Sequence, residues 1–165
     1  MKGDSAVARW LLALAATLLA PPAVQAAGAA AAPASASSSA ASARPAKPDL
    51  SGRRQVGKAS FYARRFAGRR MADGTPMDPR DDNAASKTLP LGTTAKVTNL
   101  ATGQSANVTI QDRGPYVKGR IVDLSPATAQ QIGITPTQGL APVEVAPIAV
   151  PQPDGSVKPG VAAGR

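Results

Sequence analysis

The chain has 165 residues, a formal net charge of +9, and neither cysteine nor histidine. These absences exclude disulfides, thiol nucleophiles, a lipidated cysteine, Ser-His-Asp triads and the usual zinc sites, so catalysis must use carboxylates, hydroxyls, lysine or backbone groups. Aromatic residues make up only 3% of the chain, which leaves a small aliphatic core, and the positive charge suits nucleic acid, acidic lipid or cell-wall polymer.

Residues 1–26 have the pattern of a secretory signal peptide. Lys2 and Arg9 precede an apolar run at residues 10–20, and Ala26 is a small residue suited to the cleavage site. The apolar run is shorter than the about 20 residues that a membrane span needs. We therefore expect export to the periplasm or cell envelope, with cleavage after Ala26 and neither a stable membrane anchor nor a lipid anchor.

The composition predicts one folded domain, at residues 55–150. Residues 27–54 are rich in Ala, Ser and Pro and lack the bulky apolar groups that offset the entropy cost of ordering, so they are expected to form a disordered linker. Residues 151–165 also contain little that could fill a core, and we expect a disordered tail.

Most of the domain is predicted to be β-structure. Strands are expected at residues 56–63, 93–99, 105–111, 120–124 and 140–148, and the second and third of these form a hairpin. Residues 64–90 show no clear period and read as a long, basic, irregular loop. Ser125 and Pro126 mark the start of one short helix that ends before Gly133. A closed barrel fits so small a set of strands better than a sandwich, because closure hides strand edges.

The sharpest candidate for chemistry is Asp112, in the sequence QDRGPY at residues 111–116. A strand that ends in a Gly-Pro turn can direct this carboxylate out of the barrel as an acid/base catalyst. The alternative is that Asp112 only caps the turn or pairs with Arg113. Asp123 is a second candidate, although its place just before the helix start favours a plainer role, in which it pairs with Arg120 or Arg113 or accepts amide hydrogen bonds.

Two further features have both a functional and a plain interpretation. Four arginines at 64, 65, 69 and 70 surround Phe66, and they form either a docking strip for an anionic polymer or a solvated surface. Aspartates at 78, 81 and 82 lack the spacing of a calcium loop, so we expect no metal and no cofactor. An exported protein rarely meets nucleic acid, which is therefore not an expected partner.

Three segments together resemble the rare lipoprotein A family of bacterial envelope proteins. They are GKASFYARRFAGRRMADGTPMD (57–78), AASKTLPLGTTAKVTNLATGQSANVTIQDRGPY (84–116) and GRIVDLSPATAQQIG (119–133). The resemblance implies an all-β fold, a six-stranded double-psi β-barrel with one or two short helices. It also implies endolytic lytic transglycosylase activity on peptidoglycan, which cleaves between N-acetylmuramic acid and N-acetylglucosamine and leaves a 1,6-anhydro end. We expect the domain to act on glycan strands as a monomer.

The resemblance also assigns roles to individual residues. The family's catalytic aspartate falls on Asp112, while its usual glutamate and histidine positions are Thr75 and Ser86 here, which can hydrogen-bond a sugar but cannot donate a proton near neutral pH. The other residues expected to bind substrate are Arg113, Tyr62, Tyr116 and Asp123. An alternative follows from the two replacements: a barrel that binds peptidoglycan with weak or no turnover.

Overall fold

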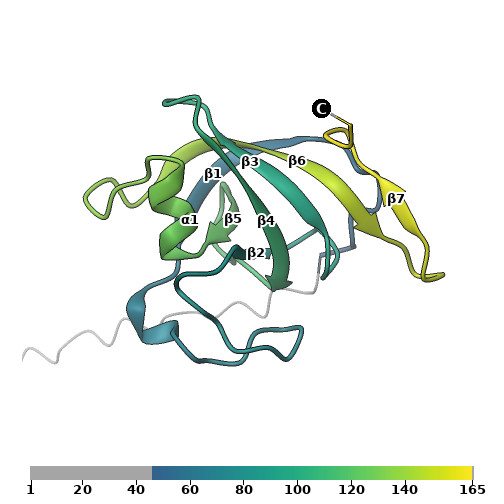
Figure 1. Cartoon of the computed structure of the whole chain (residues 1–165), viewed down its shortest axis with the longest axis horizontal. Coiled ribbons are helices and arrows are strands. Elements are labelled where there is room, and N and C mark those ends of the chain that lie inside the picture. Colours follow the sequence, from purple (N-terminus) through teal and green to yellow (C-terminus); the bar gives the residue numbers. More distant parts are fainter. Residues whose placement is uncertain (1–45, 165) are drawn as a thin grey trace, which may run out of the picture. The chain divides into compact units, whose positions relative to one another are not determined.

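The computed structural model describes residues 46–164, and the expected signal peptide and most of the expected linker lie outside this range. Figure 1 shows the order of the elements along the chain. They are β1 (Gln55–Phe61), the 3-10 helix η1 (Arg64–Phe66), β2 (Asn83–Ser86), β3 (Thr94–Asn99), β4 (Ser105–Asp112), β5 (Arg120–Leu124), α1 (Pro126–Gln131), β6 (Ala141–Pro151) and β7 (Val157–Pro159). Within the described residues, no helix has the length and apolar character needed to cross a membrane.

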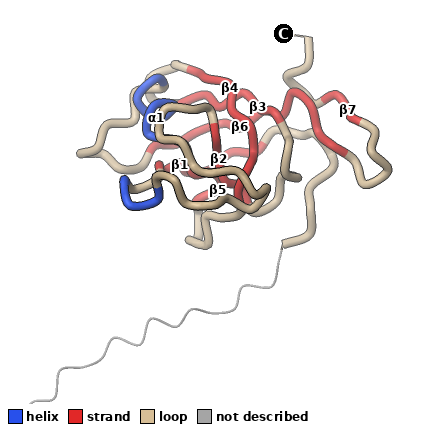
Figure 2. The backbone as a smooth tube through the Cα atoms, turned by 60° about the horizontal axis from the view of Figure 1, so that its bottom comes forward, coloured by secondary structure: helices blue, strands red, loops and turns tan. Residues whose placement is uncertain are grey.

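Six of the strands close into a barrel. Their order around the wall is β1-β5-β2-β4-β3-β6, and β6 pairs back onto β1 in an antiparallel register that starts with Gln55 opposite Val145. The pairs β1–β5 and β2–β4 are parallel, so the chain has to cross over to make each of them, whereas the other pairs within the barrel are antiparallel. Figure 2 shows these strands gathered around one interior. The predicted six-stranded double-psi β-barrel is confirmed.

The barrel interior is filled by small aliphatic side chains, as the composition predicts. In β3 and β4 every second residue is buried, which is the period expected when one face of a strand points into a core. The largest fully buried side chains are Leu89, Ile110, Leu124, Ile132 and Ile134.

The predicted helix is present as α1, and its ends are fixed by specific hydrogen bonds. Ser125 is the N-cap, and its hydroxyl accepts a hydrogen bond of 3.1 Å from the backbone N–H of Thr128. Asn99 donates from its side chain to the carbonyl of Ile132 over 2.8 Å, so the last turn is also satisfied. Gly133 follows with φ +77°, a left-handed conformation that ends a helix at little cost for glycine.

One strand was not expected from the sequence. β2 lies inside the segment predicted to be an irregular loop, and it pairs with both β4 and β5. All four of its residues are buried, so the alternation that reveals a half-exposed strand is missing. The sequence Asn-Ala-Ala-Ser is also poor in the β-branched and aromatic residues that favour strands.

The prediction of a disordered tail at residues 151–165 is wrong for the part of it that is described. β7 pairs with the end of β6, with Val150 opposite Lys158. The chain then runs back along the barrel, where Gly160 lies so close to Pro147 that a Cβ atom would collide with the Pro147 carbonyl oxygen. Backbone hydrogen bonds hold this segment, so its lack of bulky apolar side chains is not a guide to its order.

The last residues of the expected linker are also attached to the domain. The backbone N–H of Asp49 donates to the carbonyl of Thr88 over 2.7 Å. The carbonyl of Gly52 accepts from Val161 over 2.9 Å, which joins the segment before β1 to the segment after β7. The folded part of the chain therefore extends beyond 55–150 at both ends.

Candidate active site

A groove of about 450 Å³ lies where β1, β4 and β5 end. This volume falls in the range of ligand sites, roughly 300–1,000 Å³. The groove brings together five residues from three separate segments of the sequence. All five were predicted site residues, and they are Tyr62, Asp112, Arg113, Tyr116 and Asp123.

Asp112 is the last residue of β4, and three donors converge on its carboxylate. The backbone N–H groups of Ala72 and Arg113 donate to Oδ1 over 3.0 and 2.8 Å, and the Tyr62 hydroxyl donates to Oδ2 over 3.0 Å. The β2–β4 register shifts next to this point, and Asp112 pairs with Ala85 beyond the irregularity. Such irregularities commonly redirect a side chain next to a functional site. The carboxylate is therefore held in one direction, with Oδ2 carrying fewer donors than Oδ1.

Tyr62 follows directly after β1 and is half-buried. Burial, with the negative charge of Asp112 as the next contribution, raises the pKa of the Tyr62 hydroxyl well above its usual range. The hydroxyl therefore keeps its proton and acts as a donor to Asp112. The Tyr62 ring also packs edge-on against Phe66, with ring centroids 5.9 Å apart, which fixes its orientation.

Asp123 and Arg120 form an ion pair within β5. Both the Nε and a terminal nitrogen of Arg120 donate to Asp123, and the two side chains are only 23% and 15% exposed. Of the two partners considered from the sequence, Arg120 is therefore the one that Asp123 takes. Asp123 places a second carboxylate in the groove, but one that is already neutralised by a partner.

Arg113 does not pair with Asp112. Its guanidinium instead donates to the backbone carbonyls of Ser86 and Leu89, over 3.3 and 2.6 Å. Arg113 therefore fixes the turn between β2 and β3, while its backbone N–H holds Asp112. Tyr116 lies at the rim with 64% of its surface exposed, so its ring is free to contact a ligand.

Two predicted substrate-binding residues lie outside the groove. Ser86 is only 1% exposed, and its hydroxyl accepts hydrogen bonds from the backbone of Thr88 and Leu89. The Ser86 side chain is therefore enclosed and engaged, and its position gives no support to the prediction that it contacts substrate. Thr75 is exposed, but its hydroxyl donates to Asp73 over 2.7 Å instead of facing the groove.

Asp73 is a nearby carboxylate that sequence reasoning passed over. Although its slight burial alone would raise the pKa of Asp73, hydrogen bonds from Thr75 and Gln111 outweigh this and lower the pKa. The Gln111 side chain donates to the Asp73 carboxylate over 3.1 Å, and the backbone N–H of Asp73 donates to the backbone carbonyl of Gln111 over 3.0 Å. These two hydrogen bonds hold the loop that contains Asp73 against the end of β4, and so bring the backbone N–H of Ala72 within hydrogen-bond distance of Asp112. The Asp-Gly-Thr sequence was the available signal, since Asp at the start of a turn commonly accepts from the residue two positions on.

The arrangement supplies acid/base chemistry on one oriented carboxylate. Asp112 can pass a proton to a ligand and take one back, while Asp123 and Arg120 provide fixed charges beside it. Within residues 46–164, no cluster of three or more acidic side chains is arranged to hold a metal ion.

Several known proteins are similar to this chain. A probable endolytic peptidoglycan transglycosylase RlpA from Synechocystis sp. is 51% identical over 78 residues, which cover 47% of this chain and 24% of the relative. Endolytic peptidoglycan transglycosylase RlpA from Pasteurella multocida is 48% identical over 86 residues, which cover 52% and 29%. The chain thus spans less than a third of the length of these two relatives. Among solved structures, Streptomyces papain inhibitor aligns with a TM-score of 0.46 and 24% identity, over 59% of this chain and 97% of its own.

The family described as lytic transglycolase has a sequence model that matches residues 54–145, from just before β1 into β6. The match takes in the whole barrel wall up to the strand that closes it, and with it every residue that lines the groove around Asp112. Because it covers more than half of the 165 residues, the chain belongs to the lytic transglycolase family.

Proposed function

We propose that the groove cleaves the glycan strands of peptidoglycan by lytic transglycosylation, with Asp112 as the acid and then the base. The observation that carries this proposal is the convergence of Tyr62, Ala72 and Arg113 on the Asp112 carboxylate inside a groove large enough for sugar units. Family membership and the names of the relatives support the same reaction class.

The proposed reaction begins with a protonated Asp112. Oδ2 gives its proton to the glycosidic oxygen, and the bond from that oxygen to C1 of N-acetylmuramic acid breaks. The C6 hydroxyl of the same sugar then attacks C1 to form the 1,6-anhydro ring, and its proton returns to Asp112. No water is consumed, and the carboxyl group ends as it began.

The structure suggests how the proton is directed. Oδ1 accepts from two backbone N–H groups, whereas within residues 46–164 Oδ2 has only the rotatable Tyr62 hydroxyl as a partner. Oδ2 is therefore the oxygen that can hold and transfer a proton. The Arg120–Asp123 pair lies in the same groove and can orient the sugar hydroxyls.

The test is product analysis with the purified full chain and isolated cell-wall sacculi. Mass spectrometry should detect 1,6-anhydro ends, and Asp112→Asn should reduce their formation by at least about a hundredfold, which is the usual contribution of a general acid/base. The Asn side chain keeps the shape and most acceptor contacts, so circular dichroism should show an unchanged fold. If the parent chain sediments with sacculi but releases no anhydro product, the domain is a wall-binding barrel without turnover. Full activity in Asp112→Asn would show that Asp112 is a turn residue.

A further inference from the structure

Three arginines line the groove around Asp112, and they differ in what their guanidinium groups already bind. Arg113 donates to two backbone carbonyls, and Arg120 forms an ion pair within β5. Arg65 is exposed and forms no salt bridge with any residue between 46 and 164. Within the described chain, Arg65 is therefore the groove cation whose charge is still available to a ligand.

Arg65 is held at the groove by an aromatic contact. Its guanidinium carbon lies 5.0 Å from the centroid of the Phe66 ring, which is a cation–π distance. Phe66 packs edge-on against Tyr62, and the Tyr62 hydroxyl donates to Asp112. Three contacts in series thus connect the free cation to the candidate catalyst, so a group bound by Arg65 belongs to the same ligand that meets Asp112.

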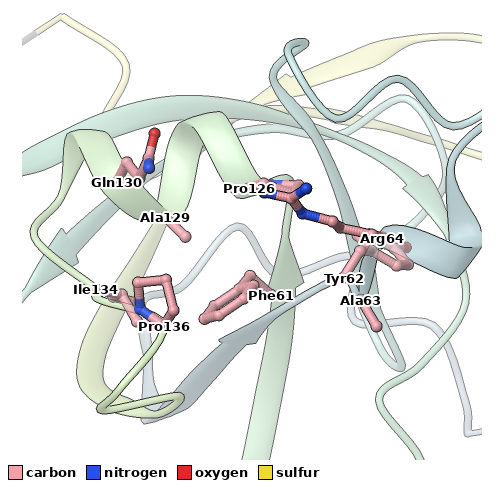
Figure 3. Close-up of a pocket in the computed structure, with 9 residues that line it drawn as sticks. All are labelled: Phe61, Tyr62, Ala63, Arg64, Pro126, Ala129, Gln130, Ile134 and Pro136. Atoms are coloured by element: carbon pink, nitrogen blue, oxygen red, sulfur yellow. The ribbon is translucent and has the colours of Figure 1, made fainter. Parts of the chain in front are cut away.

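The structure separates the four arginines that the sequence groups into one strip. Arg64 lines a different hollow, between the end of β1 and α1, as Figure 3 shows. Arg70 donates to the carbonyl of Gly74 over 3.2 Å, and neither Arg70 nor Arg69 lines the groove. Of the four, Arg65 alone has a place in the groove wall.

The ligand chemistry that fits Arg65 is a carboxylate. A planar guanidinium offers parallel N–H donors that match the two oxygens of this group. In the proposed reaction the sugar that reacts is N-acetylmuramic acid, which carries a carboxyl group on a short lactyl arm at O3. The arm is attached to the same ring as C1 and C6, so its carboxylate enters the groove with the reacting atoms. The carboxylates of a peptide attached to the arm lie further from this ring.

We propose that Arg65 binds the lactyl carboxylate of the N-acetylmuramic acid residue that occupies the groove. N-acetylglucosamine has no such arm, so this contact distinguishes the two alternating sugars and sets the register in which the strand meets Asp112. The inference rests on the proposed function, because it assigns a partner to one group of the substrate that the proposed reaction places there.

The test is a binding measurement that does not depend on turnover. Titrations of the isotope-labelled full chain, followed by NMR, compare two soluble ligands: the N-acetylglucosaminyl-N-acetylmuramic acid disaccharide, and the same disaccharide with its lactyl carboxyl group converted to a neutral methylamide. Neither ligand contains the bond between N-acetylmuramic acid and a following N-acetylglucosamine, so neither is a substrate for cleavage. The parent should bind the acid about fivefold more tightly than the methylamide, as one partly exposed charge pair allows.

Two variants separate a specific contact from general charge attraction. Arg65→Gln removes the groove cation and should bring the affinity ratio of the acid and the methylamide close to one. Arg64→Gln is the matched control, because it removes the same charge from the neighbouring exposed residue of η1, which does not line the groove. This control should keep the ratio of the parent.

Three results would overturn the proposal. The first is equal binding of the two ligands by the parent, including no measurable binding of either. The second is a ratio that Arg65→Gln leaves unchanged, whether or not both affinities fall, and the third is an equal loss of the ratio in Arg64→Gln. The outcome is separate from that of the proposed function. Preference for the acid without anhydro products would refute turnover and keep the contact, whereas anhydro products without this preference would refute the contact alone.

Discussion

The Tyr62 hydroxyl donates a hydrogen bond of 3.0 Å to Oδ2 of Asp112, and this contact ties the end of β1 to the end of β4. The two residues are 50 positions apart in the sequence. Tyr62 also lines a second hollow, of about 240 Å³, between the end of β1 and α1 (Figure 3). One residue thus orients the candidate catalyst and lines two hollows.

Tyr62→Phe should slow turnover more than it weakens the fold. The variant keeps the ring and its packing on Phe66 but removes the hydroxyl, which among residues 46–164 is the one side-chain donor to Asp112, so Oδ2 loses this partner and the carboxylate is less firmly oriented. We expect a loss of roughly tenfold in kcat, since small misplacements of reacting groups are costly, with KM changed less. The free energy of unfolding should fall by about 1 kcal/mol, the usual contribution of one hydrogen bond. Rate assays and denaturant unfolding measure the two effects, and an unchanged kcat would remove Tyr62 from any positioning role.

Alkaline pH should destabilise the protein through the same hydroxyl. The folded state raises the pKa of Tyr62 above its ordinary value of 10.0, chiefly through burial. Above about that pH the unfolded chain releases the tyrosine proton while the folded chain keeps it, so the free energy of unfolding falls as the pH rises. Tyr62→Phe should lose this part of the alkaline decline. The tyrosinate absorbance of a Tyr116→Phe variant isolates Tyr62, and ionisation of Tyr62 at its ordinary pKa in the folded state would contradict the argument.

Ser86 should prove to be a structural residue. Ser86→Ala removes an acceptor from the backbone N–H groups of Thr88 and Leu89, which should cost about 1–3 kcal/mol of unfolding free energy, and affinity for glycan should stay the same. Ser86→His, although it restores the family's usual residue, puts a larger ring into a closed site and should also cost about 1–3 kcal/mol. Thermal unfolding and glycan binding measure these effects. Weaker glycan binding by a fully folded Ser86→Ala variant would return Ser86 to the substrate-binding set.

Export is the remaining prediction from the sequence alone. The basic start, the short apolar run and Ala26 predict that the mature protein begins at or near Ala27. N-terminal sequencing of the protein recovered from the periplasm measures this directly. Recovery from the cytosol with Met1 in place would contradict both export and access to peptidoglycan.

The fold was predictable wherever the sequence carries a period or a cap. β3 and β4 alternate buried and exposed residues, and Ser125 with Pro126 marks α1 without ambiguity. β2 and β7 were missed because one is buried on every residue and the other is held by backbone pairing at an edge. In both cases the information lies in the partner strand, where a single-sequence reading cannot find it.

The candidate site was partly predictable for a similar reason. The positions of the motifs predicted that Asp112, Asp123 and Tyr62 share one groove, and the structure places all three there. The motif also led us to expect Ser86 in the groove, but the Ser86 side chain is enclosed and does not line it. A motif does not reveal whether a smaller residue at a site position still reaches the groove. The N–H of Ala72 could not be foreseen at all, because backbone donors leave no trace in residue type and depend on how a distant loop is seated.

Closure of the barrel requires two strands from opposite ends of the domain. β1 pairs with β6, and their residues are about 90 positions apart, as the Arg54–Glu144 ion pair next to this seam illustrates. A nascent chain therefore presents β1 with one edge unsatisfied until nearly the entire domain has been synthesised. Such non-local pairing slows folding, typically to milliseconds or seconds, because the entropy cost of closing a long loop comes before the stabilising contacts form. β6 is thus the strand that closes the barrel, and truncation within it should leave an open sheet with an exposed edge instead of a smaller barrel.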